Sequence, residues 1–276
     1  MSSIKPRIGA VIEARMSSSR LPGKVAMDLL PGCSMTEVIV ARAKTSCRLQ
    51  DICVATTIES ADDGFSRNLQ ERGIFVFRGD EDEITTRILG AADCLGLTSL
   101  VRLTGDNPFI DGALIDDVIA FYEAGGLDYV TTTHMGHSTK WAAERTWPRG
   151  ICVEVINIET LRRIHQSPTD MFERIQPNAA FLERPDDFRL GAFLAEGAYA
   201  DWRHPELRFT VDTAADFDFS RRVFLELCQD KGPACFSTLS AINLVLARPD
   251  LAAINADIPH ASLEDVRRSH TRKRAS

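Results

Sequence analysis

The apolar run Ile8-Gly-Ala-Val-Ile12 leads into the stretch Arg15-Met-Ser-Ser-Ser-Arg-Leu-Pro-Gly-Lys24. The run indicates a buried strand, and the stretch after it, here called the signature loop, combines three cations, three serine hydroxyls and a Pro-Gly turn. Arginine offers a planar fork to phosphate oxygens and lysine a compact charge. The turn lets Lys24 point back toward Arg15 and Arg20. These features predict a polyphosphate site at the end of the first strand; the alternative is an ordinary solvated basic loop.

Strand-like and helix-like segments alternate from residue 8 to about residue 131. Further strands are expected at 51–57, 74–77, 100–103 and 127–131, and helices at 34–45, 61–72, 82–94 and 112–124. This alternation predicts an α/β fold with a mostly parallel, doubly wound sheet. Ligands of such sheets bind outside the carboxyl ends of the strands, which is where the polar clusters of this sequence fall.

The second half of the chain is less regular and begins with a polar and aromatic loop at 132–148. Strands are expected at 151–156, 188–194 and 207–211, and helices at 157–165, 169–183, 214–230 and 237–248. We expect residues 1–262 to form a single domain, and 263–276 to be a basic, flexible tail. The pair His134 and His137 has too few companions for a zinc site.

Composition limits the classes of protein to consider. The 276 residues are 44% hydrophobic and 26% charged, enough for a substantial core. The net charge of −7 argues against a nucleic-acid partner, so the cations of the signature loop are a local feature. Seven cysteines without a C-x-x-C pair indicate reduced thiols and a cytoplasmic protein. No signal peptide or membrane-spanning run is recognisable, so no membrane partner is expected.

Two aspartates follow predicted strands. Asp106 lies in the turn Leu103-Thr-Gly-Asp-Asn-Pro108, and Asp212 ends the segment Arg208-Phe-Thr-Val-Asp212. A carboxylate in such a place can hold Mg²⁺ against phosphate oxygens, although each could instead serve a turn or a helix N-cap. The pair Asp216-Phe-Asp218 has the D-x-D form of metal-dependent glycosyltransferases, but we expect it in the first turn of a helix.

Three charged residues outside these motifs remain open from the sequence alone. Arg102 lies inside a predicted strand and needs a partner, which could be a buried salt bridge or a phosphate. Arg87 lies on a predicted helix, where a surface position is the slightly better interpretation. Glu154 is a lone charge in an apolar strand, either facing solvent or belonging to a site.

The signature loop, from Arg15 to Lys24, closely resembles that of the cytidylyltransferases that activate acidic sugars, particularly the branch named after spore-coat polysaccharide biosynthesis. A Walker phosphate loop is absent, since Val25 follows Gly23-Lys24. The resemblance implies a Rossmann-like nucleotidyltransferase sheet, CTP as substrate, and Mg²⁺ held by Asp106 and Asp212. It implies catalytic roles for Arg15, Lys24, Asp106 and Asp212. The nucleotide-binding residues that it implies are Ala14, Arg15, Ser19, Arg20, Lys24, Thr56, Arg78, Gly79, Gly105 and Asp106.

On the acceptor side, the resemblance implies contacts from Arg149, Glu154, Glu173 and Arg174. It also implies that residues 132–182 form a small acceptor and dimerisation insertion, and that the protein is a homodimer. The segment Phe172-Glu-Arg-Ile-Gln-Pro177 departs from the branch, where relatives usually read Glu-His-Val-Thr. The added guanidinium of Arg174 suggests an acceptor with another anionic group, or different subunit packing.

The resulting expectation is an Mg²⁺-dependent transfer of CMP from CTP to an acidic sugar or related small anionic acceptor, with release of pyrophosphate, for surface polysaccharide or glycan synthesis. A cytidylyltransferase acting on a phosphonate or a sugar phosphate is one alternative. The others are a sugar-nucleotide-dependent glycosyltransferase and a non-catalytic nucleotide-binding subunit.

Overall fold

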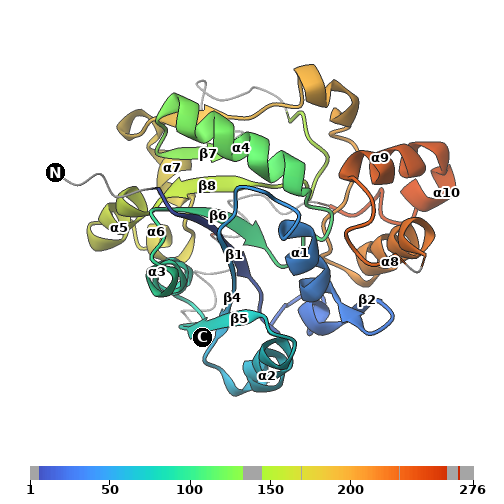
Figure 1. Cartoon of the computed structure of the whole chain (residues 1–276), viewed down its shortest axis with the longest axis horizontal. Coiled ribbons are helices and arrows are strands. Elements are labelled where there is room, and N and C mark those ends of the chain that lie inside the picture. The colour runs from blue at the N-terminus through green and yellow to red at the C-terminus, as the bar shows by residue number, and fades with distance from the viewer. Residues whose placement is uncertain (1–5, 133–144, 169, 230, 260–266, 268–276) are drawn as a thin grey trace.

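The computed structural model describes residues 6–132, 145–168, 170–229, 231–259 and 267 (Figure 1). The histidine pair at 134 and 137, most of the 132–148 loop and nearly all of the basic tail lie outside this part. The described chain is built on a seven-stranded sheet with the strand order β5-β4-β1-β6-β8-β7-β9. Helices cover both of its faces, as the alternating pattern predicted.

The strands of the sheet are β1 (Ile8–Glu13), β4 (Asp51–Thr57), β5 (Phe75–Gly79), β6 (Ser99–Thr104), β7 (Tyr129–Thr131), β8 (Glu154–Asn157) and β9 (Leu190–Ala192). A separate hairpin pairs β2 (Asp28–Leu30) with β3 (Cys33–Ser34).

The α-helices are α1 (Met35–Ala43), α2 (Asp63–Glu71), α3 (Ile84–Leu95), α4 (Gly112–Gly125), α5 (Ile158–Gln166), α6 (Phe172–Ile175), α7 (Ala179–Glu183), α8 (Ala214–Cys228), α9 (Thr238–Ala247) and α10 (Pro249–Ala252). Short 3₁₀ helices are η1 (Lys24–Ala26), η2 (Ser60–Asp62), η3 (Pro185–Asp187) and η4 (Gly197–Trp202).

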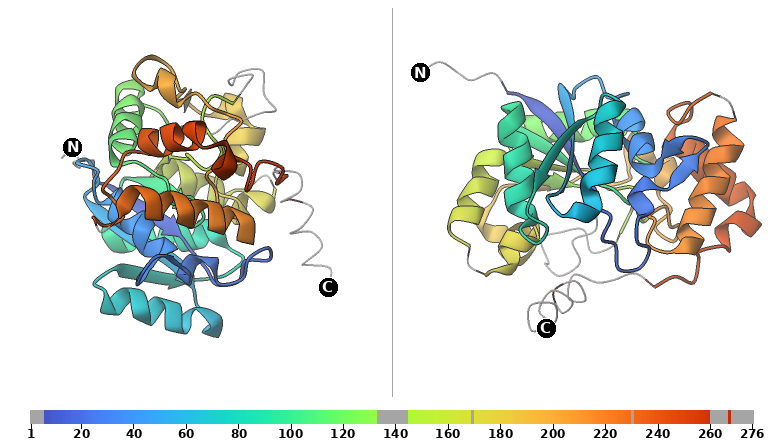
Figure 2. Two further views of the ribbon diagram at one scale, coloured as in Figure 1. Left: turned by 90° about the vertical axis from the view of Figure 1, so that its right-hand side faces the viewer. Right: turned by 90° about the horizontal axis from the view of Figure 1, so that it is seen from below.

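Alternate residues of each strand enter two separate cores. On β1, Ala10 and Ile12 pack in the core shared with α1, α2 and α4, whereas Val11 packs in the core shared with α3, α5 and α7. Because successive side chains of a strand point to opposite faces, both faces of the sheet are buried. The helices α8, α9 and α10 gather at one side of the molecule and extend the first of these cores (Figures 1 and 2).

Strand β8 runs antiparallel to its neighbours β6 and β7, while the other pairs in the sheet are parallel. The strand therefore starts at the edge where the parallel strands end, and Glu154 pairs with Arg102 and Thr131 there. The region 132–182 is thus partly built into the sheet. Its expected helix at 169–183 is divided into α6 and α7, with Pro177 between them.

The prediction of a strand at 207–211 was wrong. Only an isolated bridge between Arg149 and Arg208 forms there. The backbone hydrogen bonds of this segment go to loops instead of a strand: the N–H of Phe209 donates to Arg149 O and that of Val211 to Asp106 O. The alternating apolar side chains of this segment pack in the core, but its backbone does not form the hydrogen bonds of a sheet strand.

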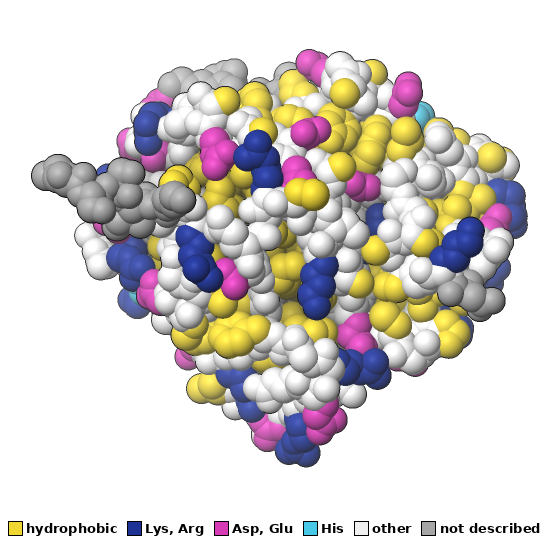
Figure 3. Space-filling view, viewed as in Figure 1, with side chains coloured by type: hydrophobic (Ala, Val, Ile, Leu, Met, Phe, Trp, Pro, Cys, Tyr) yellow, Lys and Arg dark blue, Asp and Glu magenta, His cyan; other side chains and the backbone are white. Residues whose placement is uncertain are grey.

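On the face of the molecule seen in Figure 3, basic and acidic side chains are interspersed. All seven cysteines are free, in agreement with the expected reduced thiols. Within the described ranges, no helix combines the length and the apolar character that crossing a membrane requires.

Candidate active site

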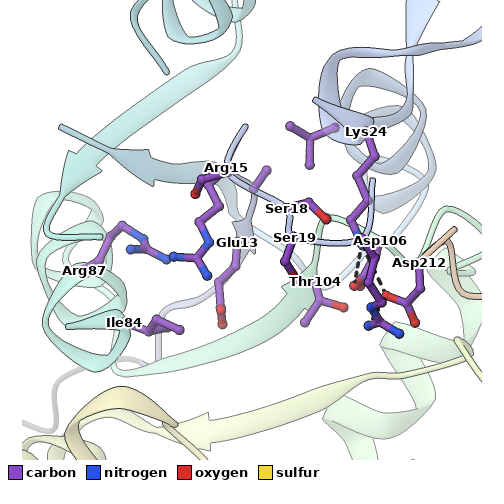
Figure 4. A pocket seen from close by; sticks show the side chains of 15 residues that line it. Glu13, Arg15, Ser18, Ser19, Lys24, Ile84, Arg87, Thr104, Asp106 and Asp212 are labelled. Atoms are coloured by element: carbon purple, nitrogen blue, oxygen red, sulfur yellow. Dashed lines mark hydrogen bonds and ion pairs between the residues drawn. The ribbon is translucent and has the colours of Figure 1, made fainter. Parts of the chain in front are cut away.

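A cavity of about 290 Å³ opens at the carboxyl ends of β1 and β6 (Figure 4). It lies where the sequence predicted a ligand site, because two neighbouring parallel strands end there. The signature loop, the β6 turn, the first turns of α3 and one residue before α8 form its wall. The lining residues are Glu13, Ala14, Arg15, Ser17, Ser18, Ser19, Arg20, Lys24, Val25, Ile84, Arg87, Thr104, Gly105, Asp106 and Asp212.

The signature loop folds back on itself through the backbone of Met16. The Met16 carbonyl accepts hydrogen bonds from Ser18 N and Gly23 N, both at 2.9 Å, and the Met16 N–H donates to Asp62 Oδ1 at 2.8 Å. Gly23 has φ of 74°, in the left-handed region that the predicted Pro-Gly turn requires. This closure directs Lys24 into the cavity.

Lys24 lies between the two aspartates that the sequence singled out. Its Nζ is 3.2 Å from Asp106 Oδ2, 3.4 Å from Asp212 Oδ1 and 2.7 Å from the carbonyl oxygen of Val211. Burial alone would raise the pKa of Asp106, but the Lys24 ammonium and a hydrogen bond from Thr104 hold this pKa below its usual range. Asp106 is therefore an anion at neutral pH.

Asp212 is held by cations on both sides of its carboxylate. Arg20 Nη2 lies 2.7 Å from Asp212 Oδ1, and Arg208 Nη2 lies 2.9 Å from Asp212 Oδ2. The N-cap of α8 is Thr213, which forms a capping box with Asp216. The alternative role of Asp212 as a helix cap is thus excluded, and its carboxylate is directed into the cavity.

The D-x-D pair does not form a site. Asp216 is fully buried and accepts from Arg208 Nε at 2.7 Å and from Asn255 Nδ2 at 3.0 Å. Asp218 is half-exposed and pairs with Arg222 on the surface of α8. Asp216 lies in the first turn of α8, as expected, and Asp218 follows in the next turn, so the pair does not stand at a strand end as a glycosyltransferase would need.

The other end of the cavity carries a second group of cations. Arg15 and Arg87 lie side by side there, with Glu13 and Thr104 between them and Lys24 (Figure 4). Arg15 Nη1 is 3.2 Å from Glu81 Oε1. The signature loop therefore spreads its charges along the cavity: Arg20 and Lys24 meet at Asp212, whereas Arg15 points to the opposite end.

The surface interpretation of Arg87 was wrong. Arg87 is 2% exposed and donates through Nη1 to the Glu81 carbonyl oxygen at 3.1 Å. Its Nε has no hydrogen-bond partner although it is buried. Desolvation of the guanidinium lowers its pKa from the ordinary value. A buried guanidinium with an unused donor at the cavity wall is suited to an incoming phosphate.

A buried charge network lies under the middle of the cavity. Arg102 bonds Glu13 through Nε and Glu154 Oε2 through Nη1 at 2.5 Å. Glu154 also accepts from the Tyr129 hydroxyl and from Asn178 Nδ2. The buried salt bridge considered for Arg102 is confirmed, since Glu13 and Glu154 hold its pKa well above the ordinary value against the effect of burial.

Residues 10–223 match the family described as cytidylyltransferase, which covers most of the chain and every lining residue of the cavity. The chain belongs to the cytidylyltransferase family. The resemblance drawn from the signature loop is therefore confirmed, together with the α/β nucleotidyltransferase fold.

Individual relatives agree with this assignment. The chain is 29% identical over 230 residues to the Bacillus subtilis spore coat polysaccharide biosynthesis protein SpsF, covering 78% of this chain and 85% of the relative. A cytidylyltransferase structure from Leptospira borgpetersenii superposes with a TM-score of 0.79 at 26% identity, covering 92% and 100% of the two chains. A CMP:2-keto-3-deoxy-manno-octonic acid synthetase shares the fold, with a TM-score of 0.60 at 18% identity over 80% and 99%.

The donor set of this cytidylyltransferase fits Mg²⁺. Oxygens of Asp106 and Asp212 converge on one point, where the Lys24 ammonium lies within 3.4 Å of both. Mg²⁺ is usually bound by one or two carboxylates together with substrate phosphates. No group of three or more His, Cys, Asp or Glu side chains suited to a metal occurs among the described residues.

Three residues that the family resemblance assigned to the nucleotide lie beyond the cavity lining. Thr56 is fully buried and donates to Asp62 Oδ2 at 2.9 Å. Arg78 donates to Thr57 O and to Asp63 Oδ1 at the end of β5, and Gly79 follows it. Their nucleotide roles stay predictions, and Thr56 acts here on the signature loop through Asp62.

The predicted acceptor residues are spread over two segments. Arg149 lies beside Arg208, and Glu154 belongs to the buried network under the cavity. Glu173 is buried and pairs with Arg184 at 3.0 Å. Arg174 Nε lies 3.3 Å from Glu83 Oε2. Glu83 is the N-cap of α3, and the first turns of this helix line the cavity. Their acceptor roles stay predictions.

Sequence reasoning missed Glu13, Thr104 and Arg208 as members of the site or its support. Glu13 ends the first strand just before the signature loop, a position that could have marked it. Arg208 precedes Asp212 by four residues, but its contact with Asp212 depends on the segment 207–212 staying outside the sheet. No local sequence pattern indicates this conformation.

Proposed function

We propose that this cytidylyltransferase transfers CMP from CTP to an acidic sugar or a related small anionic acceptor, with Mg²⁺ as cofactor and pyrophosphate as the second product. The observation that carries the proposal is the meeting of Lys24, Asp106 and Asp212 at one end of the cavity. Membership of the cytidylyltransferase family supports CTP as the nucleotide. The name of the SpsF relative supports a role in surface polysaccharide or glycan synthesis.

In the proposed reaction, an acceptor oxygen attacks the α-phosphorus of CTP. The bond from that phosphorus to the oxygen bridging to the β-phosphorus breaks, and its electron pair leaves with pyrophosphate. Direct displacement of this kind needs no covalent intermediate on the protein. Catalysis then consists mainly of positioning and of compensation of charge.

The cavity cations would bind the triphosphate. Arg20 and Lys24 both lie at Asp212. Arg15 and Arg87 lie at the other end (Figure 4), so phosphate oxygens can be neutralised along the whole cavity. Nucleotide binding would replace the contacts of Lys24 with the two aspartates, so that the carboxylate oxygens facing the lysine become available to a metal ion. Each charge-assisted hydrogen bond to a phosphate is stronger than a neutral one.

Asp106 and Asp212 would hold Mg²⁺, which when bound supplies charge neutralisation at the phosphate and acceptor oxygens. Arg208 keeps the Asp212 carboxylate oriented, and the turn at Gly105 fixes Asp106. Preorganised carboxylates avoid the cost of reorienting them during the reaction.

The decisive experiment measures pyrophosphate release with Mg²⁺, comparing CTP, UTP, ATP and GTP against pooled acidic sugars, sugar phosphates and phosphonates. Acceptor-dependent release with CTP alone supports the proposal, and deconvolution of the pool identifies the acceptor. Binding of CTP without release from any acceptor favours a non-catalytic nucleotide-binding subunit. The presence of Lys24, Asp106 and Asp212 in one cavity argues against that alternative, which has no need of all three.

We also propose that the enzyme is a cytoplasmic homodimer, since CTP and reduced thiols belong to that compartment. The dimer would use the region 132–182. Light scattering that gives twice the chain mass of 30.5 kDa supports this part of the proposal, and a monomer at micromolar concentration contradicts it.

A further inference from the structure

The loop between β5 and α3 contacts two of the cavity cations. The backbone carbonyl oxygen of Glu81 accepts hydrogen bonds from Arg15 Nη1 at 3.3 Å and from Arg87 Nη1 at 3.1 Å. The two guanidinium groups therefore converge on one oxygen atom, and Figure 4 shows them side by side. Burial lowers the pKa of Arg87, and the charge of Arg15 adds to this effect. Because like charges this close repel each other, their arrangement needs a nearby anion.

The carboxylate of Glu81 is that anion. Its Oε1 atom lies 3.2 Å from Arg15 Nη1 and also accepts a hydrogen bond from the Ser17 hydroxyl. Within the described ranges, no other carboxylate forms an ion pair with Arg15 or with Arg87. Glu81 therefore joins the signature loop, which carries Arg15 and Ser17, to the loop that leads into α3.

Glu81 acts from outside the cavity. Arg15, Ser17 and Arg87 line the cavity, whereas Glu81 is not one of its lining residues. Both hydrogen bonds that Arg15 forms within the described part of the chain use Nη1, and Arg87 Nε is buried without a partner. Donors on each guanidinium thus stay available to a phosphate while Glu81 holds the group in place.

The backbone on both sides of Glu81 is fixed by its own loop. Asp80 Oδ1 accepts hydrogen bonds from Asp82 N and Glu83 N, both at 2.8 Å, as in an Asx turn. Arg87 Nη1 also donates to the carbonyl oxygen of Asp80. The Glu81 carboxylate therefore reaches the signature loop from a defined position.

We propose that Glu81 is a positioning residue of the nucleotide site, which holds Arg15 beside Arg87 so that both cations are in place when the triphosphate enters. The inference rests on the proposed function and deepens it, because it gives an anion a supporting role in binding a polyanion. Preorganised donors avoid the cost of orienting them on binding. Without the Glu81 charge, repulsion from Arg87 would turn the Arg15 side chain, which is 26% exposed, toward solvent.

The test measures the binding of CTP and of inorganic tripolyphosphate, each with Mg²⁺, to the full-length proteins by titration calorimetry. Glu81→Gln keeps the shape of the side chain and removes its charge. We expect it to weaken both ligands by about tenfold, in the range of one charge-assisted hydrogen bond. General electrostatics predicts the opposite sign, since loss of a negative charge near the cavity strengthens the attraction of a polyanion. Unchanged or tighter binding by Glu81→Gln would overturn the positioning role.

Asp82→Asn is the matched control. Asp82 is an exposed residue of the same loop, and its side chain has no hydrogen-bond or ion-pair partner in the part of the chain that the structure describes. Its substitution removes the same charge one residue away, so the affinity for both ligands should stay within twofold of the wild type. A tenfold loss in Asp82→Asn as well would assign the effect to the charge of the loop and not to the contact of Glu81 with Arg15.

A double-mutant cycle shows whether Glu81 acts through Arg15. Arg15→Gln alone should weaken both ligands, and adding Glu81→Gln to it should change the affinity by less than twofold, because the group that Glu81 positions is gone. Additive losses would refute the inference. Tripolyphosphate binding that is weakened in Glu81→Gln supports the positioning role even if the wild type does not bind CTP, a result that contradicts the proposed function. Failure of the wild type to bind either ligand refutes both.

Discussion

The buried ammonium of Lys24 connects two carboxylates that come from opposite halves of the chain. Asp106 follows β6 and Asp212 precedes α8, yet both lie within 3.4 Å of the same Nζ atom. A cation is needed there because the buried carboxylate of Asp212 and the partly buried carboxylate of Asp106 lie close together and repel each other. For the same electrostatic reason, the space between the two carboxylates suits a divalent cation once the Lys24 ammonium has moved from them to a phosphate.

At this scale we predict that Asp106→Asn lowers turnover by on the order of a hundredfold or more, since the metal ion that compensates charge in the transition state would lose one of its two protein ligands. The fold should persist, because asparagine has the same shape and the carboxylate is not needed for the core. Pyrophosphate release and circular dichroism check the two statements. Asp93→Asn, an exposed aspartate on α3, is the control. Retention of the Mg²⁺-dependent rate in Asp106→Asn would contradict the metal assignment.

At the scale of elements, Asp62 joins the signature loop to the sheet. Its carboxylate accepts from Met16 N in the loop and from Thr56 and Thr57 at the end of β4. Burial would raise the pKa of Asp62, but the hydrogen bonds from Thr57, Met16 and Thr56 outweigh it and hold this pKa below its usual range. Asp62 therefore contributes to the stability of the loop as an anion.

We predict that Asp62→Asn lowers the free energy of unfolding by about 1.5–3 kcal/mol at pH 7, the size of a charge-assisted hydrogen bond. Because the folded pKa is depressed, this contribution is present above the unfolded value of about 3.9 and is lost as the pH falls through the folded pKa. Denaturant titrations at several pH values check both points. A difference between wild type and variant that is as large at the acid end as at pH 7 would contradict the mechanism.

The ends of β1 and β6 approach each other closely at Gly105. A Cβ on Gly105 would lie 2.7 Å from Glu13 O and 3.0 Å from Ala14 Cβ. We predict that Gly105→Ala destabilises the protein by about 1–3 kcal/mol through overpacking, and lowers turnover because Asp106 moves with the turn. Gly64→Ala is the matched control: nothing lies within 4 Å of its Cβ, and it is in a helix. Equal stability of the two variants would show that the turn can relax.

At the scale of the whole molecule, the cavity joins segments that span most of the sequence. A ligand that bridges them should stabilise the fold as one unit. We predict that CTP with Mg²⁺ at one hundred times its Kd raises the free energy of unfolding by about 2.7 kcal/mol. Thermal melts with CTP alone, CTP with Mg²⁺ and CTP with EDTA check this. An equal shift with and without the metal ion would argue against carboxylates that share Mg²⁺ with the nucleotide.

The sequence by itself determined the strands and helices of the alternating pattern up to residue 131 and the chemistry of their ends, but not the hairpin of β2 and β3. Strand and helix periodicity predicted β1, β4, β5 and β6 nearly to the residue, because both faces of a parallel sheet demand continuous apolar runs. The helix expected from residue 34 begins at Met35, where Ser34 and Glu37 form a capping box. The signature loop carries its own charges and turn, so the family could be recognised from ten adjacent residues.

Only the tertiary structure decided the residues that meet across long separations. The direction of β8, the burial of Arg87, the network around Arg102 and the pairing of Arg149 with Arg208 depend on contacts between distant segments. A local pattern shows that a charge is present but not which partner neutralises it. The partner is fixed by the packing of the whole chain, since a buried charge is stable only where another segment supplies its counterpart.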